Sequence, residues 1–226
     1  TSLLDRLDDP EEYTAETFIN GTLYHMDSTR VDGKVVVETL SEYGHPLGDS
    51  LKGQPAFSIL IPEPNEAQQK LVVEHRKVLD AFNVDGNFHA EYFISKNGDV
   101  CFLEIAWRPA GRPVNCNYSQ YTGLDQTSAY IGLKTKTIDQ SDIKHNAPKY
   151  FQVILMKQQG VYNGFSLPDT INHYEVLDEI ALGSSSGAAN IYLDFSAVIN
   201  IHGNSYQELY ENFLAIRDAG KISQFI

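Results

Sequence analysis

The sequence is poor in cysteine, in basic residues and in long apolar runs. Two cysteines, Cys101 and Cys116, are too few for a disulfide framework and lack zinc-site spacing, which favours a reducing, cytoplasmic location. No stretch comes near the roughly 18 consecutive apolar residues of a membrane span, and residues 1–10 lack the apolar core of a signal peptide. The 17 lysines and arginines face 30 acids, which argues against long contacts with nucleic acid.

What the sequence does contain is enough apolar material for a core. Apolar residues make up 42% of the 226 residues, which suits one large or two small domains. The net charge of −13 is unfavourable for a phosphate binder, unless acidic side chains recruit Mg²⁺ and the metal supplies the positive charge.

The apolar pattern predicts an α+β fold with a mainly antiparallel sheet. Helices are predicted over 65–82 and 124–133, and from Ser205 to just before Gly220. Strands are predicted over 13–19, 24–29, 35–40, 57–61, 88–94, 100–107, 150–156, 173–176, 191–195 and 197–201. A polar connection near residue 148 divides the chain into residues 1–148 and a smaller C-terminal lobe, 149–226.

The turn at Asn97-Gly98 predicts a hairpin with two acids facing each other. If the loop has two residues, cross-strand partners have numbers that add up to 195, so Glu91 lies opposite Glu104. The predicted acidic face also carries His89, Phe93, Phe102, Ala106 and Arg108. The other face is apolar and is expected to lie on the core, with Tyr92, Ile94, Cys101, Leu103, Ile105 and Trp107.

Two carboxylates opposed across a sheet repel each other, so the pair calls for a function. A divalent cation with oxygen ligands would relieve the repulsion, and so would a shared proton. Arg108 has the planar guanidinium that suits phosphate oxygens. The alternatives are a solvated outer face, or a retaining glycosidase, whose carboxylates lie about 5 Å apart and which needs neither Mg²⁺ nor ATP.

Three segments resemble the ATP-grasp superfamily, in particular its carboxylate–amine ligase, amino-acid ligase and carboxylase-like branch. The hairpin HAEYFISKNGDVCFLEIAWRPAGR over 89–112 resembles the family's magnesium-binding motif. The segment AETFINGTLYHMDSTRVDGKVVV over 15–37 resembles its hinge and the strand that follows. Residues 123–133 resemble the helix after the phosphate-binding arginine, and the end of the chain resembles the small C-terminal lobe.

The resemblance implies ATP and Mg²⁺ (or Mn²⁺) as cofactors, and it implies roles for particular residues. Glu91 and Glu104 would be metal ligands, and Arg108 would contact the phosphates and an acyl-phosphate intermediate. The adenine hinge would be Glu16, Thr17, Phe18 and Ile19. Leu23 stands where many members have a ribose-binding glutamate, so Tyr24 or His25 would take that role. Ala106 stands where many members have asparagine, which weakens a two-metal site.

Five further residues are candidates for substrate contact. In the family, the region after the strand that is predicted here over 35–40 borders the acceptor pocket, and it contains Tyr43 and His45; a plain surface loop is the alternative. His89 shares the acidic face with Glu91, although a structural histidine is equally compatible. Arg112 and Asn115 follow Arg108 on what would be the substrate side.

The function implied is an ATP-dependent ligase that joins a small-molecule carboxylate to an amine (or thiol) through an acyl phosphate. The family's phosphate lysines and glycine-rich loop precede the hinge, where this chain has no room, so the chain is expected to be the C-terminal part of a longer enzyme and inactive alone. A homodimer is compatible with this interpretation. The non-catalytic alternative is a degenerate nucleotide-binding module.

Overall fold

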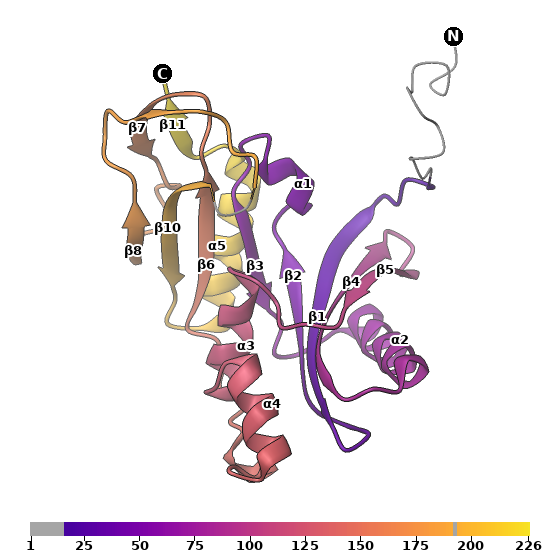
Figure 1. Cartoon of the computed structure of the whole chain (residues 1–226). Helices are drawn as coiled ribbons and strands as arrows, with labels where there is room; N and C mark the ends of the chain where they lie inside the picture. Colours follow the sequence, from indigo (N-terminus) through magenta and orange to yellow (C-terminus); the bar gives the residue numbers. More distant parts are fainter. Residues whose placement is uncertain (1–15, 192–193) are drawn as a thin grey trace.

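The computed structural model describes residues 16–191 and 194–226. Its main feature is an eight-stranded sheet in the order β5-β4-β1-β2-β3-β6-β10-β8 (Figure 1). All the strand pairs are antiparallel, which confirms the α+β prediction. The strands are β1 (Gly21–Val31), β2 (Lys34–Tyr43), β3 (Ala56–Leu60), β4 (Gly86–Ser95), β5 (Val100–Ala106), β6 (Tyr150–Met156), β8 (Tyr174–Glu179) and β10 (Phe195–His202).

A smaller sheet and several helices complete the described part. The small sheet has the order β11-β7-β9, from β7 (Gly160–Phe165), β9 (Ser185–Ser186) and β11 (Ser223–Phe225). The helices are α1 (Leu47–Ser50), α2 (Glu66–Phe82), α3 (Val114–Thr122), α4 (Gln126–Thr135) and α5 (Tyr206–Ala219). No helix of the described residues is long and apolar enough to cross a membrane.

Local signals in the sequence account for several element ends. Asp32 and Gly33 both have positive φ, +50° and +76°, as the tight turn of the β1–β2 hairpin requires. Asn65 caps α2 by accepting from the Gln68 amide, and Ser205 caps α5 by accepting from the Glu208 amide.

The alternation of side chains along β1 and β4 separates two environments. On one face, Met26, Ala90 and Tyr92 pack in a core with Leu71 of α2. The other face carries polar residues, including His25 and Asp27 of β1, which pair with Glu91 and His89 of β4. Because side chains alternate along strands, this register places all four on the face away from α2.

The C-terminal strands β6 and β10 are largely buried. One face of β6 and β10 packs on α5, where Phe151, Val153 and Ile199 contact Phe213 and its neighbours in the largest core. Figure 1 shows α5 lying along these two strands.

The sheet continues across the predicted boundary at 148, because β3 pairs with β6. The division into two domains stays a prediction.

Two predicted strands differ from the structure. Residues 16–20 are not in a strand, since β1 begins at Gly21, and residues 13–15 lie outside the described residues. Ile191 is in a bend and β10 starts only at Phe195, with residues 192 and 193 outside the description. The short α1 and the helix α3 were not predicted.

The β4–β5 hairpin reaches the predicted pairing by a different route. The Ser95 amide donates to the Asp99 carbonyl at 2.9 Å, so the loop has three residues rather than two. Tyr92 therefore pairs with Phe102, but a register shift beyond Tyr92 leaves Leu103 as an extra residue and restores the predicted pair of Glu91 and Glu104.

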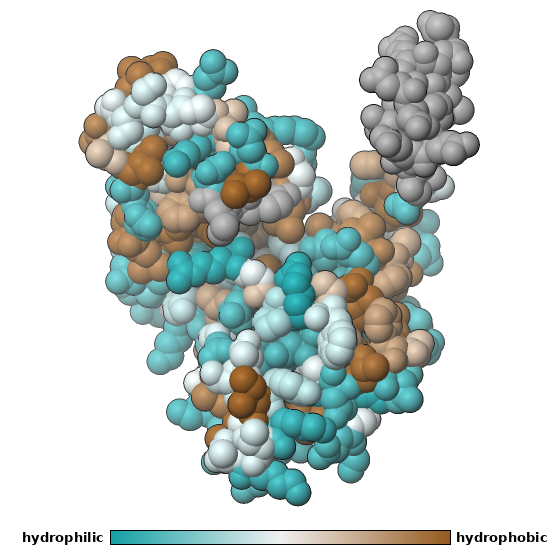
Figure 2. All heavy atoms as spheres, in the orientation of Figure 1, coloured by the Kyte–Doolittle hydropathy of each residue, from teal (hydrophilic) through white to brown (hydrophobic). Residues whose placement is uncertain are grey.

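Several residues of the hairpin differ from the prediction in the face or the exposure that they have. Phe102 was expected on the acidic face, yet its ring packs on Tyr92 at 5.5 Å between centroids, on the α2 side. Leu103 and Trp107 were expected on the core, but they are 42% and 66% exposed. The cause is that β5 is the edge strand of the sheet. Figure 2 shows hydrophobic side chains gathered on the side of the molecule where β4 and β5 lie.

Candidate functional site

A cavity of about 610 Å³ lies where β4 and β5 meet the segment before α3. Glu91, Glu104 and Arg108 all line it, as the hairpin argument predicted for one face. Three of the five substrate candidates line it too, namely Tyr43, His89 and Arg112. The remainder of its lining is largely apolar and includes Leu103.

Glu91 is the buried carboxylate of the pair, 8% exposed. The Tyr43 hydroxyl donates to its Oε1 at 2.8 Å, and His89 Nε2 lies 3.4 Å from the same oxygen. Burial alone would raise the pKa of Glu91, but the contacts with His89 and Tyr43 outweigh burial and lower it. Glu91 is therefore held ionised and in a fixed orientation.

Asp27 is the centre of the polar network behind Glu91. It is fully buried, and its two carboxylate oxygens each meet one imidazole: Oδ2 meets His25 Nδ1 and Oδ1 meets His89 Nδ1, both at 2.8 Å. Burial opposes a charge on Asp27, but the two histidines hold its pKa well below the usual range. Burial likewise opposes a charge on His89, but Asp27 and Glu91 raise its pKa to about 9.

Glu104 and Arg108 differ from Glu91 in that both are exposed. Arg108 donates from Nη1 to the carbonyl of Pro109 at 2.9 Å. Within the described residues, no hydrogen bond to the Glu104 carboxylate is found. One buried, oriented carboxylate and one exposed carboxylate on paired residues form an oxygen donor set that suits Mg²⁺, which is bound through a few carboxylates and retained waters.

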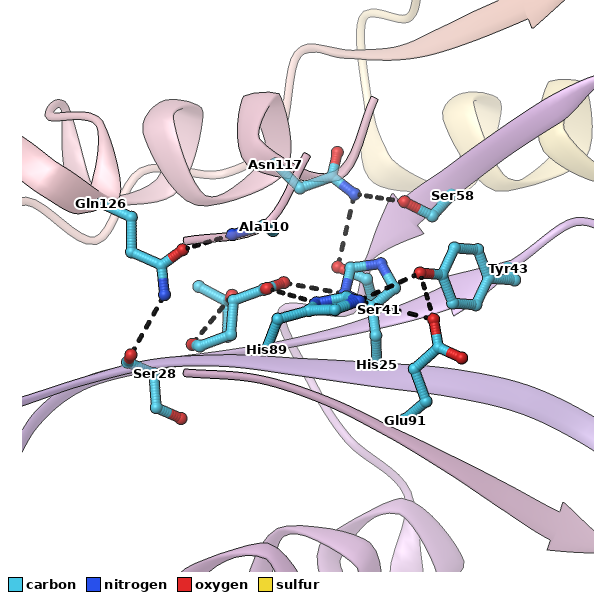
Figure 3. Close-up of polar contacts among 12 residues, drawn as sticks. His25, Ser28, Ser41, Tyr43, Ser58, His89, Glu91, Ala110, Asn117 and Gln126 are labelled. Atoms are coloured by element: carbon cyan, nitrogen blue, oxygen red, sulfur yellow. Dashed lines mark hydrogen bonds and ion pairs between the residues drawn. The ribbon is translucent and has the colours of Figure 1, made fainter. Parts of the chain in front are cut away.

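Two amides fix the segment that carries the arginines. Gln126 of α4 accepts from the Ala110 amide at 3.0 Å and donates to the carbonyls of Ser28 and Phe88, each at 3.1 Å. Asn117 of α3 donates to the hydroxyls of Ser41 and Ser58, at 3.3 and 3.0 Å. Both amides are buried, and Figure 3 shows them between the helices and the sheet. The segment between β5 and α3 is thereby tied to the sheet.

The remaining predicted residues lie elsewhere. Tyr24 faces α2, and its hydroxyl donates to Glu42 at 3.4 Å. His25 belongs to the Asp27 network. Neither His45, whose ring packs edge-on against Phe57, nor Asn115 lines the cavity.

Residues 16–19, the predicted hinge, precede β1. Phe18 is 89% exposed there. Their proposed contact with adenine stays a prediction.

Asp27 is the site residue that the sequence argument missed. Its signal was present in the sequence, because His25 and Asp27 are two residues apart on one strand, and His89 and Glu91 are two residues apart on another. Two polar residues at a spacing of two in a buried strand share a face. Only the β1–β4 register brings the two pairs together, and that register follows from long-range pairing.

At the level of sequence, no protein-family model matches the chain, and no curated protein does. Solved structures do match. An L-amino acid ligase from Bacillus licheniformis has a TM-score of 0.61 and 16% identity, over 92% of this chain and 55% of that one. An N5-carboxyaminoimidazole ribonucleotide synthetase from Thermotoga maritima has a TM-score of 0.56 and 14% identity, over 96% and 58%.

A biotin carboxylase domain from Hydrogenobacter thermophilus has a TM-score of 0.56 and 12% identity, over 92% of this chain and 48% of that one. That structure is a dimer in complex with MgADP, ADP and bicarbonate. The chain has the fold of the corresponding part of these ATP-grasp proteins. It spans about half the length of these ATP-grasp neighbours, and the likeness at this identity concerns the fold alone.

Proposed function

We propose that this chain carries the metal-binding half of the active site of an ATP-dependent ligase. The substrate carboxylate would attack the γ-phosphate of ATP to give an acyl phosphate and ADP, and an amine (or thiol) would then displace the phosphate. The observation that carries the proposal is the meeting of Glu91, Glu104 and Arg108 in one cavity. The ATP-grasp fold and the MgADP held by one structural neighbour support it.

The residues of this chain would work by positioning and by charge. Glu91 and Glu104 would hold Mg²⁺, which when bound offsets the negative charge of the transferring phosphoryl group. Tyr43 and His89 keep the Glu91 carboxylate in one orientation. Arg108 would bind phosphate oxygens with its guanidinium, and Arg112 on the same cavity would orient a substrate carboxylate.

The test is Glu104→Ala in the natural full-length protein. We expect Mg-ATP-dependent ADP release to fall by about 100-fold or more, as when a group that stabilises transition-state charge is removed. Asp99→Ala is the matched control, because Asp99 is an exposed acid beside the loop of the same hairpin and does not line the cavity. Turnover retained at the wild-type rate in Glu104→Ala would contradict the assignment.

A second candidate, nucleotide binding without turnover, is favoured by Leu23. This residue is buried in an apolar cluster with Tyr43, Ala110 and Val114, where the family resemblance implies a ribose-binding acid. Calorimetry with Mg-ATP on the full-length protein separates the two functions. Binding without ADP release, over a panel of amines and carboxylates, would support the module and exclude the ligase.

A further inference from the structure

The cavity has a second part that the proposed chemistry does not use. Beyond Tyr43 its lining is formed by an apolar wall, defined here as Leu47, Ala56, Ile154, Met156, Phe195 and Val198. The wall residues come from α1, β3, β6 and β10. Ala56 and Val198 each pair with Ile154, and Phe195 pairs with Met156. Residues opposed on neighbouring strands share a face, so the wall is one continuous surface of the sheet.

This surface is the face of β6 and β10 that points away from α5. The intervening residues Val153, Leu155 and Ile199 belong to the core that packs on α5. The wall residues instead form a separate cluster with Leu51 and Ala189. Leu47 also packs in the cluster that contains Tyr43, so it joins the wall to the polar part of the cavity. Among the described residues, the cavity therefore runs from two glutamates and two arginines to an end lined by apolar side chains.

The composition of the two ends specifies a class of ligand. None of the wall residues has a titratable or hydrogen-bonding side chain, so a polar group placed there would lose its bonds to water without replacement. The nearest acid along the row, Asp178 on β8, pairs with Val198 but is exposed and does not line the cavity. A volume of about 610 Å³ is in the range of small-molecule sites rather than of protein interfaces.

We propose that the cavity binds a small carboxylic acid, amino acids included, whose body is an uncharged aliphatic or aromatic group. The body would lie against the apolar wall, and the carboxylate would lie at Arg112, which leaves Arg108 for phosphate oxygens. The inference names the substrate class of the proposed ligase, and in that respect it rests on the proposed function. The binding of such an acid does not depend on that function.

The test is calorimetric binding to the natural full-length protein, with and without Mg-ADP. The probes are two matched pairs, leucine with asparagine and hexanoate with adipate. We expect the apolar member of each pair to bind at least about tenfold more tightly, because an amide or a carboxylate placed against the wall would lose its hydrogen bonds to water without replacement. Equal or tighter binding of asparagine and adipate would overturn the proposal, as would failure of both apolar probes to bind.

Two neighbouring residues of β6 provide a variant and its control. Met156→Ala enlarges the apolar end and should raise the affinity for phenylalanine relative to leucine by about tenfold. Leu155→Ala removes an equally buried side chain from the α5 face and should leave that ratio unchanged. Equal changes in both variants would overturn the proposal. If Met156→Ala does not fold, the isosteric Val198→Thr should weaken hexanoate binding, and unchanged binding would contradict the assignment.

These measurements separate this inference from the ligase proposal. Binding is measured without turnover, so tight binding of apolar acids combined with no ADP release would exclude the ligase and leave the apolar site in place. ADP release that requires polar substrates, without binding of apolar acids, would support the ligase and exclude the apolar site.

Discussion

The Tyr43 hydroxyl donates to Glu91 Oε1 at 2.8 Å across the width of a strand, because Tyr43 lies on β2, Glu91 lies on β4, and β1 separates them in the sheet. The bond fixes one oxygen of Glu91, which is the buried carboxylate of the pair Glu91 and Glu104. The neighbouring His89 contacts the same oxygen, so the orientation of Glu91 is determined from two sides.

Tyr43→Phe should therefore weaken metal binding without unfolding the protein. We expect the affinity for Mn²⁺ in the presence of nucleotide to fall by about tenfold, which is typical of removing a hydrogen bond that orients a metal ligand. The measurement is a Mn²⁺ titration followed by electron paramagnetic resonance. Tyr162→Phe is the matched control, because Tyr162 is equally buried and donates to Glu179 at 2.8 Å outside the cavity. Equal losses in both variants would contradict a specific role for Tyr43.

Asp27→Asn should destabilise the fold strongly. Asp27 is the buried anion between His25 and His89, and the pKa of His89, about 9, keeps that imidazole charged at neutral pH. Removing one partner of a buried ion pair typically costs about 3–5 kcal/mol, and in Asp27→Asn both imidazoles lose the charge of the Asp27 carboxylate. Urea denaturation measures the change in unfolding free energy.

Asp80→Asn is the control for that variant, since the Asp80 side chain is 77% exposed and 4.0 Å from Arg30. It should change the unfolding free energy by less than about 0.5 kcal/mol. A loss below about 1 kcal/mol for Asp27→Asn would show that the network does not depend on this charge.

The hairpin shows what could be predicted from the sequence. Local turn chemistry predicts that 97–98 is a turn, and the pair Glu91 and Glu104 follows from counting outward. The count is correct only because a three-residue loop and the extra residue Leu103 compensate each other. Neither has a clear local signal, so the sequence could not predict that Phe102 faces Tyr92.

The environments of histidines show what could not be predicted. The charged neighbours of His75 suggest a solvated helical residue, yet it is fully buried between Ser28 and Tyr92. Its burial depends on how α2 packs on β1 and β4, which lie far from it in sequence. The Asp27 network likewise requires the β1–β4 register, which no turn between the two strands sets.

His75 should make the stability pH-dependent on the acid side. Burial lowers the pKa of His75 from 6.5 to about 4 in the folded protein. The unfolded chain therefore binds a proton first as the pH falls, so the contribution of neutral His75 is complete above pH 6.5 and is lost as the pH falls through about 4. The full loss is about 3 kcal/mol.

The measurement is the unfolding free energy of the wild type and of His75→Gln between pH 7 and pH 4. The difference between them should shrink toward acid pH, because a glutamine side chain cannot titrate, and subtraction removes the contribution of the acids. The exposed His145→Gln should leave the profile unchanged. Parallel profiles for the wild type and His75→Gln would show that His75 does not stay neutral.

Gly86→Ala should displace the single tryptophan of the chain and disturb Arg108, the residue that follows it. Gly86 has φ of +144°, and a Cβ there would lie 2.1 Å from Nε1 of Trp107. The indole now donates from Nε1 to the Asp85 carbonyl at 3.1 Å, which holds the end of β5 against the start of β4.

We expect a loss of about 1–3 kcal/mol from backbone strain, and stronger quenching of Trp107 fluorescence by iodide, since the indole must leave its contact with Gly86. Nucleotide affinity should fall as well if Arg108 binds phosphate. Gly187→Ala is the control, because its Cβ would meet nothing within 4 Å and its φ is not positive. Unchanged quenching and stability in Gly86→Ala would mean that Trp107 does not anchor this end of β5, and the position of Arg108 would then depend on the contacts of Gln126 and Asn117.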